Sequence, residues 1–372
     1  MLASFFAPLL LLTSLSLPGA HHTENVVLVT YDGLRWQEVF SGADDALLTK
    51  KEGGVHDPDA LRAAYGRGTP EARREALLPF LWGVVARQGQ VYGNGQRGSV
   101  ARVTNGRNFS YPGYQEILCG FGDPKIDSND KVLNANVSVL EWLNGKDAFR
   151  GRVAAFTEWD CFPFILNRGR SGLLVNAGLA PMEGEGLSER EKILNRVLAD
   201  TNWEHADQRS DALTYNFAEA YFERKHPRVL YLGFGETDEW AHAGRYDLVL
   251  EGAHRIDGYL ARLWAAVQAT PEYAGKTSLV ITTDHGRGDA PLAWKDHGEK
   301  VPVSDKIWIA VLGPDTPALG ERKDCAEVTQ SQVAATVAAL LGEDWKAAEP
   351  RAGAPIAEAV APGGAPGSAK DR

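Results

Sequence analysis

This chain has few cysteines, and its basic residues are outnumbered by its acidic ones. Its 372 residues contain three cysteines, and this odd number leaves either one disulfide with a free thiol or no disulfide. No Cys-x-x-Cys metal pattern is present. The net charge is −10 and the pI is about 5.5, which argues against binding to a nucleic-acid duplex. Internal repeats and heptad arrays are also missing, which excludes solenoid and coiled-coil architectures.

Only one long hydrophobic run occurs, at the N-terminus. Residues 2–17 carry no charge and are followed by Pro18-Gly19-Ala20 and a polar stretch. This pattern predicts a signal peptide over residues 1–20, and the run is short for a membrane span. No Lys or Arg precedes the run, so a retained N-terminal anchor is the alternative. Both interpretations place the folded part in the periplasm or outside the cell, and no transmembrane helix is expected in the mature chain.

The rest of the chain is long enough for one large α/β domain or two smaller ones. Short apolar runs rich in β-branched residues alternate with helical patterns. We expect these runs to form buried strands, among them residues 25–31, 228–234 and 278–283. The alternation predicts a mainly parallel sheet with helices on both faces.

Three segments are expected to lie outside this sheet. The polar, Gly- and Asp-rich residues 41–68 predict a long loop or excursion. Residues 160–226 contain two helical patterns and are expected to form an inserted cap. Residues 346–372 are rich in Ala, Pro, Gly and Glu, a composition that predicts disorder. The folded domain is therefore expected to span residues 24–345.

Side chains that can bind a metal follow three of the expected strands. Asp238 and His242 are four positions apart, so a helix would place both on one face. A carboxylate and an imidazole so placed can share a metal ion, although an ordinary strand-to-helix junction has the same pattern. The other candidates are Asp32, Asp284, His285 and, in a loop, His297. The carboxyl ends of parallel strands are where open α/β sheets bind ligands.

Ser110 precedes a Tyr-Pro-Gly turn, and residues 114–119 have the pattern of a helix start. The free N–H groups and positive dipole end of a helix would stabilise an alkoxide there and hold an anion. A serine in this position can equally be a helix N-cap without a chemical role.

Together, these separated motifs resemble the alkaline phosphatase superfamily, and most closely its nucleotide pyrophosphatase/phosphodiesterase branch. Asp32-Gly-Leu-Arg-Trp36 resembles the first metal motif of that branch, and Ser110-Tyr-Pro-Gly-Tyr114 resembles its nucleophile motif. The chain resembles the remaining metal motifs of the branch in three places: Glu236-Thr-Asp-Glu-Trp-Ala-His242, Thr283-Asp-His-Gly286 and Asp296-His-Gly298. The resemblance covers about residues 25–315 and implies an alkaline-phosphatase-like three-layer sandwich.

The resemblance also implies two divalent metal ions. One would be bound by Asp238, His242 and His297. The other would be bound by Asp32, Asp284, His285 and the hydroxyl oxygen of Ser110. Mixed nitrogen and oxygen ligands suit Zn²⁺ best, with Mn²⁺ as the alternative. The implied reaction is hydrolysis of a small-molecule phosphoester through a phosphoseryl intermediate on Ser110.

The resemblance implies two substrate contacts, one from Asn129 and one from the backbone N–H near Tyr111. Asn129 follows Ser110 at a spacing two residues shorter than in the family. Gly113 and Tyr114 replace an Asn-His pair of the branch, so contacts with the leaving group are expected to differ. A phosphodiester is the expected substrate, and a phosphomonoester is the alternative. A sulfatase would need Arg where Tyr114 stands, and a phosphotransferase fits a secretory leader poorly. A binding protein that keeps the metals is the alternative that is not an enzyme.

Overall fold

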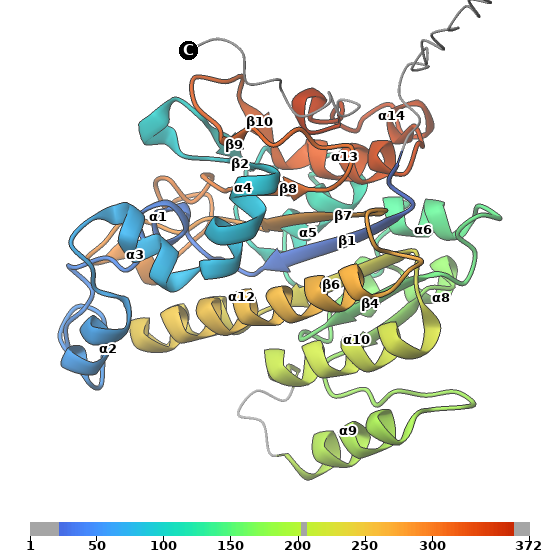
Figure 1. The fold of residues 1–372 in the computed structure, drawn as a ribbon, viewed down its shortest axis with the longest axis horizontal. Helices are drawn as coiled ribbons and strands as arrows, with labels where there is room; N and C mark the ends of the chain where they lie inside the picture. Colours follow the sequence, from blue (N-terminus) through green and yellow to red (C-terminus); the bar gives the residue numbers. More distant parts are fainter. Residues whose placement is uncertain (1–21, 202–206, 361–372) are drawn as a thin grey trace, which may run out of the picture.

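The computed structural model describes residues 22–201 and 207–360, so the predicted signal peptide lies outside the described residues. An eight-stranded sheet forms the middle layer, in the order β5-β4-β6-β1-β7-β8-β2-β9 (Figure 1). Its strands are β1 (Asn25–Tyr31), β2 (Gln90–Tyr92), β4 (Val153–Thr157), β5 (Leu174–Ala177), β6 (Val229–Phe234), β7 (Thr277–Thr283), β8 (Ile309–Leu312) and β9 (Gly320–Glu321). β8 pairs antiparallel with β7 and β2, and the other neighbours are parallel. The expected mainly parallel sheet is confirmed.

Alternating side chains of β1 divide the interior into two cores, one on each face of the sheet. Val27 and Val29 pack into the first core, and Val26 and Leu28 into the second. The first face is covered by α10 (Asp211–Lys225) and α12 (Tyr246–Ala269), and the second by α5 (Ser110–Cys119), α6 (Val139–Asn144) and α13 (Val333–Leu340). Figure 1 shows α10 and α12 on one side of the sheet and α13 on the other. This is the expected three-layer sandwich.

The prediction that residues 160–226 form an inserted cap over the sheet is wrong for β5, which is a strand of the sheet itself. β5 pairs in parallel with β4 at the edge of the sheet, and α10 packs against the central sheet. The two predicted helices are present as α9 (Glu189–Asp200), which begins at a capping box of Ser188 and Glu191, and α10. β5 has only four residues, which is too short for an apolar run to be distinguished from a loop by its pattern.

Two other segments are more ordered than their composition predicts. Residues 41–68 contain α2 (Pro58–Tyr65), and Leu47 and Leu48 within them are fully buried. Residues 346–360 include the end of α14 (Trp345–Ala348) and bury Ala352, Ile356 and Ala359 in the second core. A few apolar side chains anchor each segment, whereas the predictions followed the average composition. The last residues, 361–372, lie outside the described part of the chain.

All three cysteines are described and free, and Cys119 and Cys161 are buried. Among the helices of residues 22–201 and 207–360, none combines the length and apolar character that crossing a membrane requires.

The register of the three central strands places the candidate residues. Tyr31, at the end of β1, pairs with Phe234 at the end of β6 and with Thr283 at the end of β7. The residues that follow these three positions are Asp32, Gly235 and Asp284. Because parallel strands present their carboxyl ends at the same edge, these residues lie side by side there.

Candidate metal centre and active site

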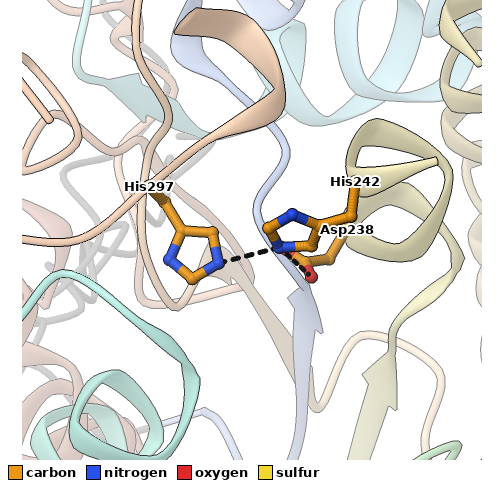
Figure 2. A group of neighbouring side chains, drawn as sticks. All are labelled: Asp238, His242 and His297. Carbon is orange, nitrogen blue, oxygen red and sulfur yellow. Dashed lines mark hydrogen bonds and ion pairs between the residues drawn. The ribbon is translucent and has the colours of Figure 1, made fainter. Parts of the chain in front are cut away.

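The first candidate ligand group lies at the end of β6. The chain continues from this strand into α11 (Glu236–His242), which carries Asp238 and His242 one turn apart. His242 Nε2 lies 3.2 Å from Asp238 Oδ2 and 3.0 Å from His297 Nε2 (Figure 2). Ligand atoms of all three side chains fall within 4.8 Å of one another. The structure therefore brings together the three residues of the first predicted set.

His297 is oriented by a backbone carbonyl on the opposite side of its ring. Its Nδ1 lies 3.1 Å from the carbonyl oxygen of Asn108, whose φ of +54° is in the left-handed region that asparagine tolerates. With Nδ1 donating, the lone pair on Nε2 points to His242. Burial, together with the positive charge of His285, holds the pKa of His297 well below its usual range. Burial also lowers the pKa of His242, so both imidazoles are in the neutral form that binds metal.

The second ligand group lies beside the first, at the ends of β1 and β7. His285 Nε2 is 3.2 Å from Asp32 Oδ1, 3.4 Å from Asp284 Oδ2 and 3.6 Å from Asp238 Oδ1. His285 Nδ1 lies 3.0 Å from the Gly286 carbonyl, which leaves Nε2 as the ligand atom. Three of the four residues of the second predicted set, Asp32, Asp284 and His285, thus lie together, and Asp238 belongs to both ligand groups.

Three atoms of the second group fit a cation by their chemistry. Asp32 Oδ1, Asp284 Oδ2 and His285 Nε2 are buried and have no hydrogen-bond partner. Burial and the charge of Asp32 raise the pKa of Asp284 well above its usual range. Burial lowers the pKa of His285, but the carboxylates of Asp284 and Asp32 outweigh it and raise that pKa to about 9. Positive charge is therefore favoured at this point, and the nitrogen and oxygen donors suit a divalent transition metal.

Ser110 lies beside the ligand groups, at the start of α5 in the layer that covers the second face of the sheet. It is the first residue of α5, whose N-cap is Phe109, so it does not have the alternative role of a helix cap. Ser110 is 7% exposed and lines a cavity of about 350 Å³ together with Asp32, Asp238, His242 and His297. A Cβ on Gly113 would lie 2.3 Å from the Asp284 carbonyl oxygen, so glycine allows the start of α5 to pack against the second ligand group.

The two predicted substrate contacts differ in outcome. The Tyr111 backbone N–H donates to Asn129 Oδ1 at 2.9 Å, which places the Asn129 side chain beside Ser110 at the cavity wall. Because this N–H already has an acceptor, the contact between Tyr111 and substrate is not supported. The hydrogen bond also fixes the amide of Asn129, since a backbone N–H can only donate; the Nδ2 group is the end left for another partner.

The contacts that three residues make at the site were not predicted from the sequence. The Tyr114 hydroxyl donates to Asp32 Oδ2 at 2.9 Å. Arg287 is fully buried, forms an ion pair with Asp238 Oδ1 and donates to the Asp238 carbonyl at 3.2 Å. Glu158 lies in the cavity wall, and burial, followed by the charges of neighbouring Asp211 and Asp32, raises its pKa well above the usual range. Of these, only Glu158 carried a signal, because it follows the expected strand 153–157 as Asp32 follows residues 25–31.

Replacing Tyr114 with phenylalanine is expected to weaken metal binding about 10- to 100-fold, because hydrogen-bond partners of ligands orient and tune them. Metal affinity would be measured by competition with a chromogenic chelator. Tyr111→Phe is the matched control on the same helix, since its hydroxyl donates to the Val132 carbonyl at 2.6 Å and not to a ligand. Equal metal affinity of the two variants would show that Tyr114 does not act on Asp32.

Solved structures with this fold belong to the alkaline phosphatase superfamily. The wild type alkaline phosphatase PafA matches with a TM-score of 0.58 at 10% identity, over 93% of this chain and 100% of that one. The lipoteichoic acid synthase LtaP from Listeria monocytogenes matches with a TM-score of 0.56 at 12% identity, over 88% and 74%. A phosphonate monoester hydrolase from Silicibacter pomeroyi matches at 0.52 and 14%, over 94% and 78%. Their TM-scores show that this chain shares the fold of these proteins.

A sequence model of a protein family matches most of this chain. The model of type I phosphodiesterase / nucleotide pyrophosphatase matches residues 54–340, well over half of the chain, and the chain belongs to this family. Asp32 precedes the matched stretch, and the other proposed ligands fall within it. None of the curated proteins matches the chain significantly. The resemblance inferred from the motifs is confirmed.

Proposed function

We propose that this protein hydrolyses small-molecule phosphodiesters in the periplasm or outside the cell, using two divalent metal ions and Ser110 as nucleophile. The observation that carries the proposal is the convergence of two nitrogen- and oxygen-donor groups beside the first residue of α5. The location rests on the predicted signal peptide alone.

Each ligand group would hold one ion, preferably Zn²⁺, with Mn²⁺ as the alternative. Asp238, His242 and His297 would bind the first. The second would be bound by Asp32, Asp284 and His285, together with the hydroxyl oxygen of Ser110. When bound, such ions supply Lewis-acid stabilisation of the negative charge that develops on attacking and leaving oxygens.

The protein side of the reaction follows from the position of Ser110. Its Oγ forms a bond to phosphorus while the bond from phosphorus to the leaving alcohol breaks. The serine loses its proton and the alcohol gains one, which leaves a phosphoseryl ester. Water then adds to phosphorus, the ester bond to Ser110 breaks, and the serine regains a proton. The Nδ2 group of Asn129 and the positive end of α5 would stabilise the non-bridging oxygens.

The decisive experiment compares an aryl phosphate, a bis-aryl phosphate and an aryl sulfate at equal metal content. We expect kcat/KM for the bis-aryl phosphate to exceed that for the monoester at least tenfold, with no turnover of the sulfate. A higher value for the monoester would favour a phosphomonoesterase. Preference for the sulfate would favour a sulfatase. A metal-loaded protein inactive on all three would favour a binding protein.

A further inference from the structure

Among the described residues, Asp238 is the one that belongs to both candidate ligand groups. Its two carboxylate oxygens face different groups. Oδ2 lies 3.2 Å from His242 Nε2 in the first group, and Oδ1 lies 3.6 Å from His285 Nε2 in the second. A carboxylate with one oxygen toward each group can bind a single ion or bridge two, because both oxygens are acceptors. The proposed reaction leaves both arrangements open.

Arg287 occupies the oxygen that a bridge would need. Its Nη2 group forms an ion pair with Asp238 Oδ1 and donates to the Asp238 carbonyl at 3.2 Å, and its Nη1 group donates to the Lys295 carbonyl at 2.5 Å. Arg287 is 2% exposed. Burial lowers the pKa of Arg287 to about 9, so the guanidinium keeps its charge at neutral pH. Oδ1 therefore has a charged partner already, whereas Oδ2 is left for a metal ion.

The backbone on both sides of Arg287 is fixed by hydrogen bonds. The Gly286 N–H donates to the Ser304 carbonyl at 2.8 Å, and the Gly288 N–H donates to the Asp296 carbonyl at 3.1 Å. Because both neighbours are held, the guanidinium is directed at Asp238 by the loop as well as by its own contacts. A contact supported in this way is preorganised, as positioning residues of metal sites require.

Gly33 leaves the room for this ion pair. Its φ is +58°, and a Cβ at this position would lie 2.7 Å from Asp238 Oδ1 and 2.9 Å from Arg287 Nε. Any other residue would therefore push the two side chains apart. Gly33 directly follows Asp32, so the strand end that supplies a ligand of the second group also leaves space for the contact that holds Asp238.

We propose that Arg287 is a positioning residue that restricts Asp238 to the first metal ion, by holding Oδ1 and leaving Oδ2 as the ligand atom. The inference rests on the proposed two-metal function and deepens it. Without Arg287, Oδ1 would be free to bind the second ion and would compete with the hydroxyl of Ser110 for it. Arg287 therefore keeps the second ion available to the nucleophile.

The test compares crystals of the Zn²⁺-loaded full chain with those of Arg287→Met, with the ions located by anomalous diffraction. In the wild type, we expect Oδ2 on one ion and Oδ1 on Arg287. In Arg287→Met, Asp238 is expected to contact both ions, with two ions per chain retained and kcat on a bis-aryl phosphate lowered about tenfold. Metal affinity alone is not diagnostic, because removing a positive charge by itself favours cation binding.

Two further variants separate positioning from packing. Arg287→Lys keeps a positive charge beside Oδ1 and is expected to keep Asp238 on one ion and to retain more of kcat than Arg287→Met. A residue that only filled space would be replaced as well by methionine as by lysine. Lys300→Met removes a positive charge from an exposed position in the same part of the chain and is expected to match the wild type in ligation and in kcat.

The outcomes distinguish this role from the reaction itself. A wild type in which Asp238 bridges both ions would overturn the positioning role, and so would Arg287→Met with Asp238 on one ion. If Arg287→Met does not fold, the wild type and Arg287→Lys decide between the same two arrangements. Two bound ions with Oδ1 on Arg287, but no turnover of any ester, would overturn the proposed function and leave the positioning role intact. A Zn²⁺-loaded crystal without metal at Asp238 would overturn both.

Discussion

Replacing Ser110 with alanine is expected to lower kcat on a bis-aryl phosphate on the order of 10³-fold or more. The hydroxyl is the atom that bonds to phosphorus in the proposed reaction, and no other hydroxyl is assigned this step. The substitution removes only one oxygen from the first turn of α5, where Phe109 provides the N-cap. The fold and the metal group at Asp238 should therefore persist. Steady-state kinetics and metal analysis on the same sample measure both effects.

Two further variants distinguish lost chemistry from lost structure. Ser110→Thr keeps a hydroxyl and is expected to retain part of the turnover, with a trapped phosphoryl group detectable by mass spectrometry. Ser138→Ala removes a hydroxyl from another helix start, where Ser138 Oγ accepts from the Glu141 N–H at 3.1 Å. Losing that cap is expected to cost about 1 kcal/mol of stability and no turnover. Substantial turnover by Ser110→Ala would mean that Ser110 is not the nucleophile.

The central strands and the proposed ligands could be predicted together because both depend on the same simple pattern. The apolar run 25–31 coincides with β1, and the register of β1 with β6 and β7 aligns their ends. A polar residue directly after such a run must then lie at the shared edge. The same rule applies to Glu158, which directly follows β4.

Other contacts could not be predicted because they depend on where loops return. Tyr111 and Asn129 are 18 residues apart, and the hydrogen bond between them exists only because the intervening loop folds back onto α5. Arg287 reaches Asp238 across 49 residues, and no local pattern determines the direction of its side chain. Within the predicted cap of residues 160–226, β5 was not predicted for a related reason, since it becomes a strand through pairing with β4.

Removing the metal ions with a chelator is expected to abolish turnover and to lower the thermal unfolding midpoint. Asp32, Asp238 and Asp284 lie close together, and Asp32 Oδ1 and Asp284 Oδ2 have no hydrogen-bond partner. A cation relieves this repulsion in the folded state only. A free metal concentration of 100 times the dissociation constant stabilises the folded state by about 2.7 kcal/mol. Calorimetry before and after chelation, with plasma emission analysis of metal content, measures the loss.

Asp284→Asn tests whether the two ligand groups are separate metal sites. The amide keeps the volume of the side chain and removes one charge from the second group, whereas Asp238, His242 and His297 are unchanged. The variant is therefore expected to hold one ion per chain instead of two and to remain inactive when Zn²⁺ is restored, while the chelated wild type recovers. Full activity of the metal-stripped wild type, or two ions in Asp284→Asn, would contradict the two-metal arrangement. Asp289→Asn changes an exposed aspartate in the same segment, where Oδ1 accepts from Gln37, and should bind two ions like the wild type.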